Sequence, residues 1–145
     1  MQGAIVDAAC TISTESREQI IDLGILPILK ISRDKQGVKK PFSIKLENCV
    51  LTRPNPTLSD WRKFQVTFDG QAKGLLFELQ GEAVGVALKI SNAAGHVAEP
   101  GLPLPQEDIL SEEMRLNYFI TLVANEQPLR AGTYFTSVRF KLDYF

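Results

Sequence analysis

The sequence predicts an all-β domain, an immunoglobulin-like β-sandwich, from three observations. Apolar and polar residues alternate with a period of two over several short runs, which is the pattern of half-buried strands. Glycine, proline, asparagine and aspartate separate these runs. Strong helical periodicity is scarce. Six or seven short strands with frequent turns are typical of this sandwich class.

The expected strands follow one another along the chain. In the first, Phe42, Ile44 and Leu46 alternate with polar residues. In the second, Phe64 to Phe68 alternates in the same way and ends at an Asp-Gly turn. Further runs rich in strand-forming residues predict the remaining strands over residues 75–79, 84–90, 116–124 and 133–145.

Three segments are the exceptions to this strand pattern. Residues 16–23 are ambiguous between helix and strand, whereas residues 59–62 and 108–115 favour short helical turns. None of them is long enough to change the predicted fold class.

Size and charge limit the function. The 145 residues fit one domain spanning 1–145, and 16 basic against 17 acidic residues leave no basic surface for nucleic acid. No apolar run reaches the ~20 residues that cross a bilayer, so direct membrane insertion is not expected. Met1 and Gln2 lead straight into strand-like sequence, which predicts no signal peptide in this chain. From their number alone, Cys10 and Cys49 fit one disulfide or two free thiols equally well.

No residue pattern indicates catalysis. His96 is the only histidine and lies in a predicted hairpin turn, where a solvated side chain is expected. The two cysteines lack metal-ligand spacing, and no phosphate loop, nucleophile elbow or dinucleotide fingerprint is present. The carboxylate pairs at 107–108 and 112–113 fit a solvated surface, and Trp61 fits loop packing better than sugar stacking. We therefore predict a protein that is not an enzyme and has no metal or cofactor.

The last strand has the cleanest alternation in the chain. Val138, Phe140, Leu142 and Tyr144 lie on one face, and charged residues lie on the other. This pattern continues to the final residues, although chain ends are usually polar and loosely held. Either this is an ordinary strand that happens to come last, or its apolar face is buried against something else.

The chain resembles the pilin subunits of chaperone–usher pili over nearly its whole length. Gly132, fourteenth from the end, and the penultimate Tyr144 match the family's C-terminal signature. The other matching segments occur in the expected order: the small-residue run into Cys10, Gln-x-x-x-Leu-Gly at 19–24, Phe-x-Ile-x-Leu-x-Asn-Cys at 42–49, Val-Thr-Phe-Asp-Gly at 66–70, Gly-Val-Ala-Leu at 85–88 and Leu-Asn-Tyr at 116–118.

The resemblance implies an incomplete sandwich that lacks its final strand. A groove between the first and last strands would be filled first by a periplasmic chaperone. At the outer-membrane usher, a neighbouring pilin subunit would then replace the chaperone by donor-strand exchange, a form of β-augmentation. The protein would pass through the periplasm and become part of an extracellular adhesive pilus on a Gram-negative cell, as a shaft, adaptor or terminating subunit. Residues 19–24 and 129–134 most resemble the terminating base subunit of pili similar to P pili and type 1 pili.

The resemblance also assigns residues to this groove. Val138, Phe140, Leu142 and Tyr144 would form one wall, and Val6 and Ala8 would belong to the other. The carboxylate of Phe145 would anchor the chaperone. A Cys10–Cys49 disulfide would join the first strand to the second. Only Met1 and Gln2 precede Gly3, so the chain as given would accept a strand but not donate one.

Two alternatives belong to other classes of protein. A carbohydrate-binding fimbrial adhesin module would bind specific sugars on a glycan array. A freestanding immunoglobulin-like binding module would be stable without any added strand.

Overall fold

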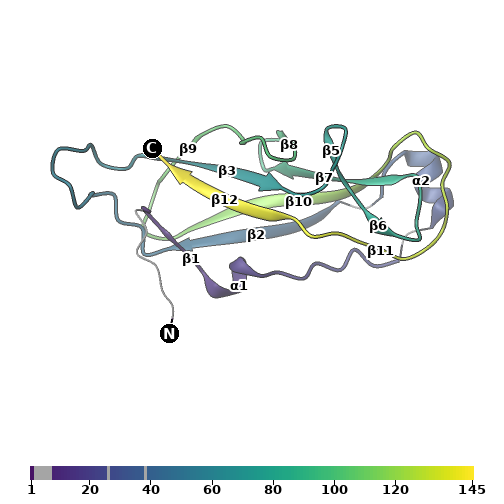
Figure 1. Ribbon diagram of the computed structural model, residues 1–145, viewed down its shortest axis with the longest axis horizontal. Coiled ribbons are helices and arrows are strands. Elements are labelled where there is room, and N and C mark those ends of the chain that lie inside the picture. The colour runs from purple at the N-terminus through teal and green to yellow at the C-terminus, as the bar shows by residue number, and fades with distance from the viewer. Residues whose placement is uncertain (2–7, 26, 38) are drawn as a thin grey trace.

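A computed structural model describes residues 1, 8–25, 27–37 and 39–145 as an elongated, strand-rich molecule (Figure 1). The strands are β1 (Thr11–Ile12), β2 (Lys40–Glu47), β3 (Lys63–Asp69), β4 (Ala72–Lys73), β5 (Leu76–Glu78), β6 (Gln80–Gly81), β7 (Val86–Asn92), β8 (Val97–Ala98), β9 (Glu107–Asp108), β10 (Met114–Ala124), β11 (Tyr134–Phe135) and β12 (Arg139–Tyr144). The helices are α1 (Thr14–Arg17) and α2 (Ile28–Asp34).

The strand order is that of an immunoglobulin sandwich without its seventh strand. The larger sheet has the order β1-β2-β10-β7-β5-β4, with β8 paired to β7, and the smaller sheet facing it has the order β12-β3-β9. Strand β11 pairs with β6 in a separate two-stranded sheet. In immunoglobulin lettering, an ABED sheet faces a CFG sheet. Strands β1, β2, β10 and β7 occupy A, B, E and D, and β3 and β12 occupy C and F. No strand of the described part of the chain occupies G, so the predicted incomplete sandwich is confirmed.

The core lies between these two sheets. Phe64, Val66 and Phe68 of β3 are almost completely buried, as their alternation predicts. Ile44 and Tyr118 face them from the larger sheet, and the rings of Phe68 and Tyr118 meet edge to face with centroids 5.0 Å apart. This aromatic contact helps hold the two sheets together.

A disulfide joins Cys10, just before β1, to Cys49, just after β2. The bond predicted from the family resemblance is therefore present. Both cysteines are buried in the core cluster. The bond ties the short strand β1, which pairs with β2 through Thr11 and Ile12, to the rest of the larger sheet.

Three local predictions need correction. Residues 108–115 and 59–62 contain no helix, and the C-terminal strand predicted over 133–145 is two strands, β11 and β12. Helix α2, which the sequence pattern did not predict, begins after Pro27 and ends where Lys35 adopts a left-handed conformation at φ 64°. Only Ile31 of this helix is buried, so its apolar periodicity is weak.

In the part of the chain that is described, no helix is long and apolar enough to cross a membrane.

Candidate functional site

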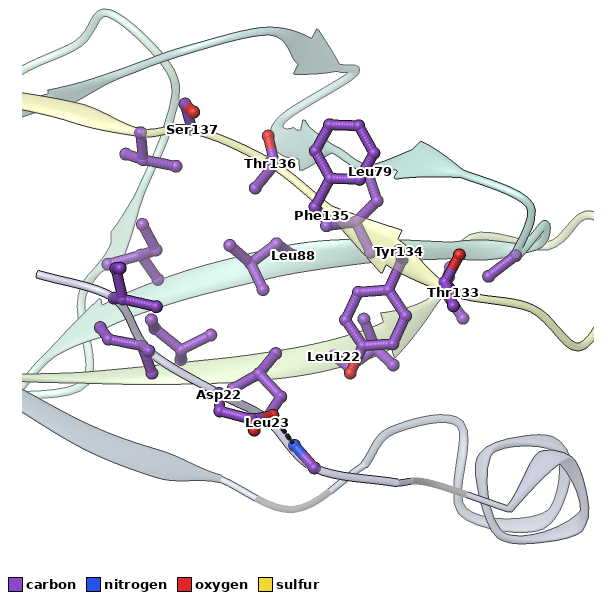
Figure 2. A pocket seen from close by; sticks show the side chains of 18 of the residues that line it. Asp22, Leu23, Leu79, Leu88, Leu122, Thr133, Tyr134, Phe135, Thr136 and Ser137 are labelled. Carbon is purple, nitrogen blue, oxygen red and sulfur yellow. Dashed lines mark hydrogen bonds between the residues drawn. The ribbon is translucent and has the colours of Figure 1, made fainter.

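A groove of about 1050 Å³ opens between the segment that follows β1 and the segment that leads into β12. Its C-terminal wall is the segment of residues 133–144, of which residues 133–138 and Phe140 line the cavity, and its N-terminal wall consists of residues 16–25. Figure 2 shows the two walls facing each other across Leu88 and Leu122, which come from β7 and β10. The floor is apolar and consists mainly of Phe42, Phe68, Leu88, Ile90, Ile120 and Leu122.

Half-buried and exposed side chains alternate along the C-terminal wall. From Thr133 to Tyr144 every even-numbered side chain is half-buried, and nearly every odd-numbered one is exposed. Val138, Phe140, Leu142 and Tyr144 pack against the core. Thr136 and Tyr134 continue the same inward face toward α2. Side chains of one face of this strand therefore line the groove or the core next to it.

The backbone of β12 has one paired edge and one open edge. Phe145 and Lys63 exchange both of their main-chain hydrogen bonds, at 2.8 and 2.9 Å. Since such pairs alternate in an antiparallel ladder, Arg139, Lys141 and Asp143 also bond to β3. The N–H and C=O groups of Phe140, Leu142 and Tyr144 then point away from β3, and no described strand pairs with them. This open edge is where the missing seventh strand would lie.

The groove closes at the Tyr144 end. The hydroxyl of Tyr144 donates a hydrogen bond to the main-chain oxygen of Cys10 at 3.3 Å, and its ring lies 5.9 Å from that of Trp61. Leu142 and Tyr144 therefore do not line the cavity. At the opposite end, Ile28 and Ile31 of α2 border the opening.

Replacing Tyr144 with phenylalanine should lower the free energy of unfolding at pH 8 by about 1 kcal/mol, because a partly buried hydrogen bond is lost. Burial raises the pKa of Tyr144 above its ordinary 10. The stability that comes from its protonated form is therefore complete below pH 10 and is lost as the pH rises through the raised pKa. Urea denaturation should show that the free energy of unfolding of wild type exceeds that of Tyr144→Phe by less at pH 11 than at pH 8. An equal advantage at both pH values would contradict this.

Of the two residues predicted for the second wall, the structure describes only Ala8. Val6 is outside the described residues. Ala8 is exposed and does not line the cavity, because the chain bends at Ala9 and Cys10 and buries both of these instead. Beyond β1, helix α1 leads the chain into residues 18–25, which form the wall. Sequence reasoning also missed the floor, although the alternation of β7 and β10 does identify its inward-facing residues.

Phe145 lies at the end of β12, beside the start of β3. Its main-chain oxygen accepts hydrogen bonds from the N–H groups of Arg62 and Lys63 at 2.7 and 2.8 Å. Its side chain is exposed. A partner can therefore reach the phenyl ring, while the main chain is held by β3.

Gly132 lies where two chain segments pass too closely for a side chain. A Cβ atom at this position would lie 2.6 Å from Cβ of Glu82 and 2.7 Å from the nitrogen of Ala83. The same approach brings Thr133 within hydrogen-bonding distance of Glu82 and Ala83. This contact sets the path of the C-terminal wall.

Replacing Gly132 with alanine should destabilise the protein by about 2 kcal/mol, because the backbone around Glu82 must move. Thermal unfolding should show a melting temperature roughly 6 °C lower. The exposed neighbour offers a control, Ala131→Ser, with an expected change within about 0.5 kcal/mol. Equal melting temperatures for Gly132→Ala and wild type would show that the segments separate easily.

Among the described residues, no group of three or more histidine, cysteine, aspartate or glutamate side chains could hold a metal ion. His96 lies in the turn after β7, where its main-chain N–H donates a hydrogen bond to the side-chain oxygen of Asn92 at 2.9 Å. The groove instead offers an apolar floor and unpaired backbone, which suit an extended peptide.

Comparisons with known proteins agree with this geometry. No protein-family model matches the chain. The chain is 34% identical over 145 residues to the PRS fimbrial minor pilin protein of Escherichia coli, covering 98% of this chain and 74% of the relative. The crystal structure of the P pilus rod subunit PapA superimposes with a TM-score of 0.82 at 20% identity, covering 95% and 100% of the two chains. A chaperone–usher pilus structure, described for its rod uncoiling, superimposes with a TM-score of 0.81 at 24% identity, covering 100% and 93%.

Proposed function

Because the chain belongs to the pilins of chaperone–usher pili, we propose that it is a structural subunit of such a pilus whose groove takes in an extended strand from another protein. Its relatives are structural pilins, and the chain is not an enzyme. The open edge of β12 is the observation that carries the proposal. It combines unpaired backbone with inward-facing apolar side chains along one strand.

The incoming strand completes the smaller sheet. In an immunoglobulin sandwich the seventh strand pairs antiparallel with the sixth. An occupant in this orientation starts beside Tyr144 and ends beside Tyr134. Its backbone pairs with Phe140 and Leu142, and its alternate side chains enter the groove above the floor residues.

The occupants follow from assembly. A periplasmic chaperone fills the groove first, contacting β12 and the residues on either side of it, Val138 and the exposed Phe145, and an outer-membrane usher receives the complex. A neighbouring pilin then supplies its own strand. Covering the groove protects apolar side chains and a free strand edge, both of which promote aggregation. The final location is an extracellular pilus.

A synthetic peptide tests this proposal directly. The peptide has roughly twelve residues, with valine or leucine at alternate positions, long enough to follow the wall from Tyr144 to Tyr134. A fluorescent label on the peptide should migrate with the protein in non-denaturing electrophoresis. The variant Val138→Asp, which places a charge in the groove, should weaken binding at least about tenfold.

A control variant separates groove binding from general charge effects. Lys141→Asp places the same charge on the exposed face of the same strand and should bind the peptide as wild type does. Absence of the label from the protein band at any peptide concentration would overturn the proposal.

A second candidate is a minor subunit that ends assembly. The fimbrial relative is a minor pilin, and the groove is closed at the Tyr144 end, where an antiparallel strand would begin. A strand that already fills the groove would then be hard to displace from this end. The test challenges a bound labelled peptide with an unlabelled one extended past Tyr144. Faster displacement by the extended peptide than by one of the original length would exclude this role.

A further inference from the structure

The groove has a polar end that an all-apolar strand would not match. Val138 and Phe140 make the C-terminal wall apolar along one half, but Thr136 and Tyr134 occupy the same inward face along the other. Figure 2 shows the Tyr134 ring extending from β11 into the space between the walls, above Leu122 and facing Asp22 and Leu23.

The hydroxyl of Tyr134 is buried and has no hydrogen-bond partner within the described part of the chain. Burial raises the pKa of Tyr134, and the negative charge of Asp22 raises it further, so the hydroxyl keeps its proton and remains a donor. One carboxylate oxygen of Asp22 accepts the N–H of Gly24 at 2.8 Å. The carboxylate offers further acceptor positions toward the groove mouth.

An unpaired hydroxyl at this depth is costly. Its oxygen is already buried while the groove is empty, so bulk solvent does not satisfy it. The backbone groups of an incoming strand are used by the open edge of the wall. A side chain of the strand that packs beside the Tyr134 ring can therefore supply the missing partner.

We propose that the strand that fills this groove carries a hydroxyl or carboxamide side chain (serine, threonine, asparagine or glutamine) opposite Tyr134. Such a group can accept a hydrogen bond from Tyr134 and donate one toward the Asp22 carboxylate. This inference rests on the proposed strand-accepting function. It adds a polar position to an otherwise apolar binding pattern.

The register places that residue within the strand. In an antiparallel pair, each later residue of the incoming strand lies opposite a residue of this chain with a lower number. Counted along the incoming strand from the residue opposite Phe140, the residue opposite Val138 comes two positions later. The residue opposite Tyr134 comes six positions later. The expected pattern is therefore two apolar residues two apart, followed four positions later by the polar residue.

Two isosteric peptides test the proposal. Both follow the alternating design of roughly twelve residues, and they differ only in threonine or valine at the position opposite Tyr134. Fluorescence anisotropy should show that the threonine peptide binds wild type about tenfold more tightly. The preference should fall to about twofold or less in Tyr134→Phe, which keeps the ring and removes the hydroxyl.

The matched control is Tyr118→Phe. It also removes a buried hydroxyl that has no partner among the described residues, but Tyr118 does not line the groove, so the threonine preference should remain. Moving the threonine two positions along the peptide should abolish the preference. Equal binding of both peptides, or the same preference in Tyr134→Phe, would overturn this inference and leave the strand-accepting function standing. Failure of both peptides to bind would overturn the two together.

Discussion

Replacing Cys10 and Cys49 together with alanine is expected to lower the free energy of unfolding by about 4 kcal/mol. The disulfide closes a loop with a sequence separation of 39, and the chain-entropy relation for loops of this length gives that magnitude. Strand β1 is only two residues long, so few other interactions hold this segment to the larger sheet. Chemical denaturation, with the midpoint and slope fitted together, measures the loss.

Reduction of the wild-type protein provides the control for this variant. Wild type kept in excess reductant should fall to nearly the same stability as the double variant, because both lack the crosslink. Mass spectrometry of non-reduced protein should find no alkylatable thiol in wild type. A loss below about 1 kcal/mol would show that the unfolded chain is already held compact by other contacts.

Backbone amides of β12 should exchange with deuterium at two distinct rates. The amides of Arg139, Lys141 and Asp143 bond to β3, whereas those of Phe140 and Leu142 face the open edge. We expect exchange about 100-fold faster at Phe140 and Leu142, which corresponds to roughly 3 kcal/mol of local protection. Nuclear magnetic resonance with residue-level resolution measures each rate.

Binding of the alternating peptide should remove this difference. The peptide backbone pairs with the open edge, so Phe140 and Leu142 should slow to the rates of their neighbours. Ile120 and Thr121 of β10 are the internal control, because β10 lies between β2 and β7 and should stay slow throughout. Uniform protection along free β12 would mean that another part of the molecule already covers this edge.

The strands were predictable because each has one buried face. Phe64, Val66 and Phe68 alternate with polar residues, and the structure buries all three. The alternation at the C-terminus was predictable for the same reason. The same half-buried face continues toward the N-terminus of this segment, through Thr136 to Tyr134. The cysteine pairing did not follow from spacing. It came from the family resemblance, which supplied the order of the strands.

The alternation of apolar and polar residues did not predict the N-terminal wall. A period of two predicts Ala8 and Cys10 on one face, but the bend at Ala9 breaks that phase. The wall formed by residues 16–25 contains no strand and only the end of helix α1, so no periodic pattern marks it. Helix α2 buries one residue against the sheet, and a helix with such a small apolar face leaves little pattern to detect.

The strands run along the long axis of the molecule (Figure 1), and this alignment has a mechanical consequence. Ladder hydrogen bonds lie perpendicular to their strands. Tension applied lengthwise therefore loads all the bonds of the β3–β12 ladder at once, in shear, instead of peeling them apart one by one. A strand inserted beside β12 would bear the same kind of load, so a chain of such subunits would resist stretching through many weak bonds acting together.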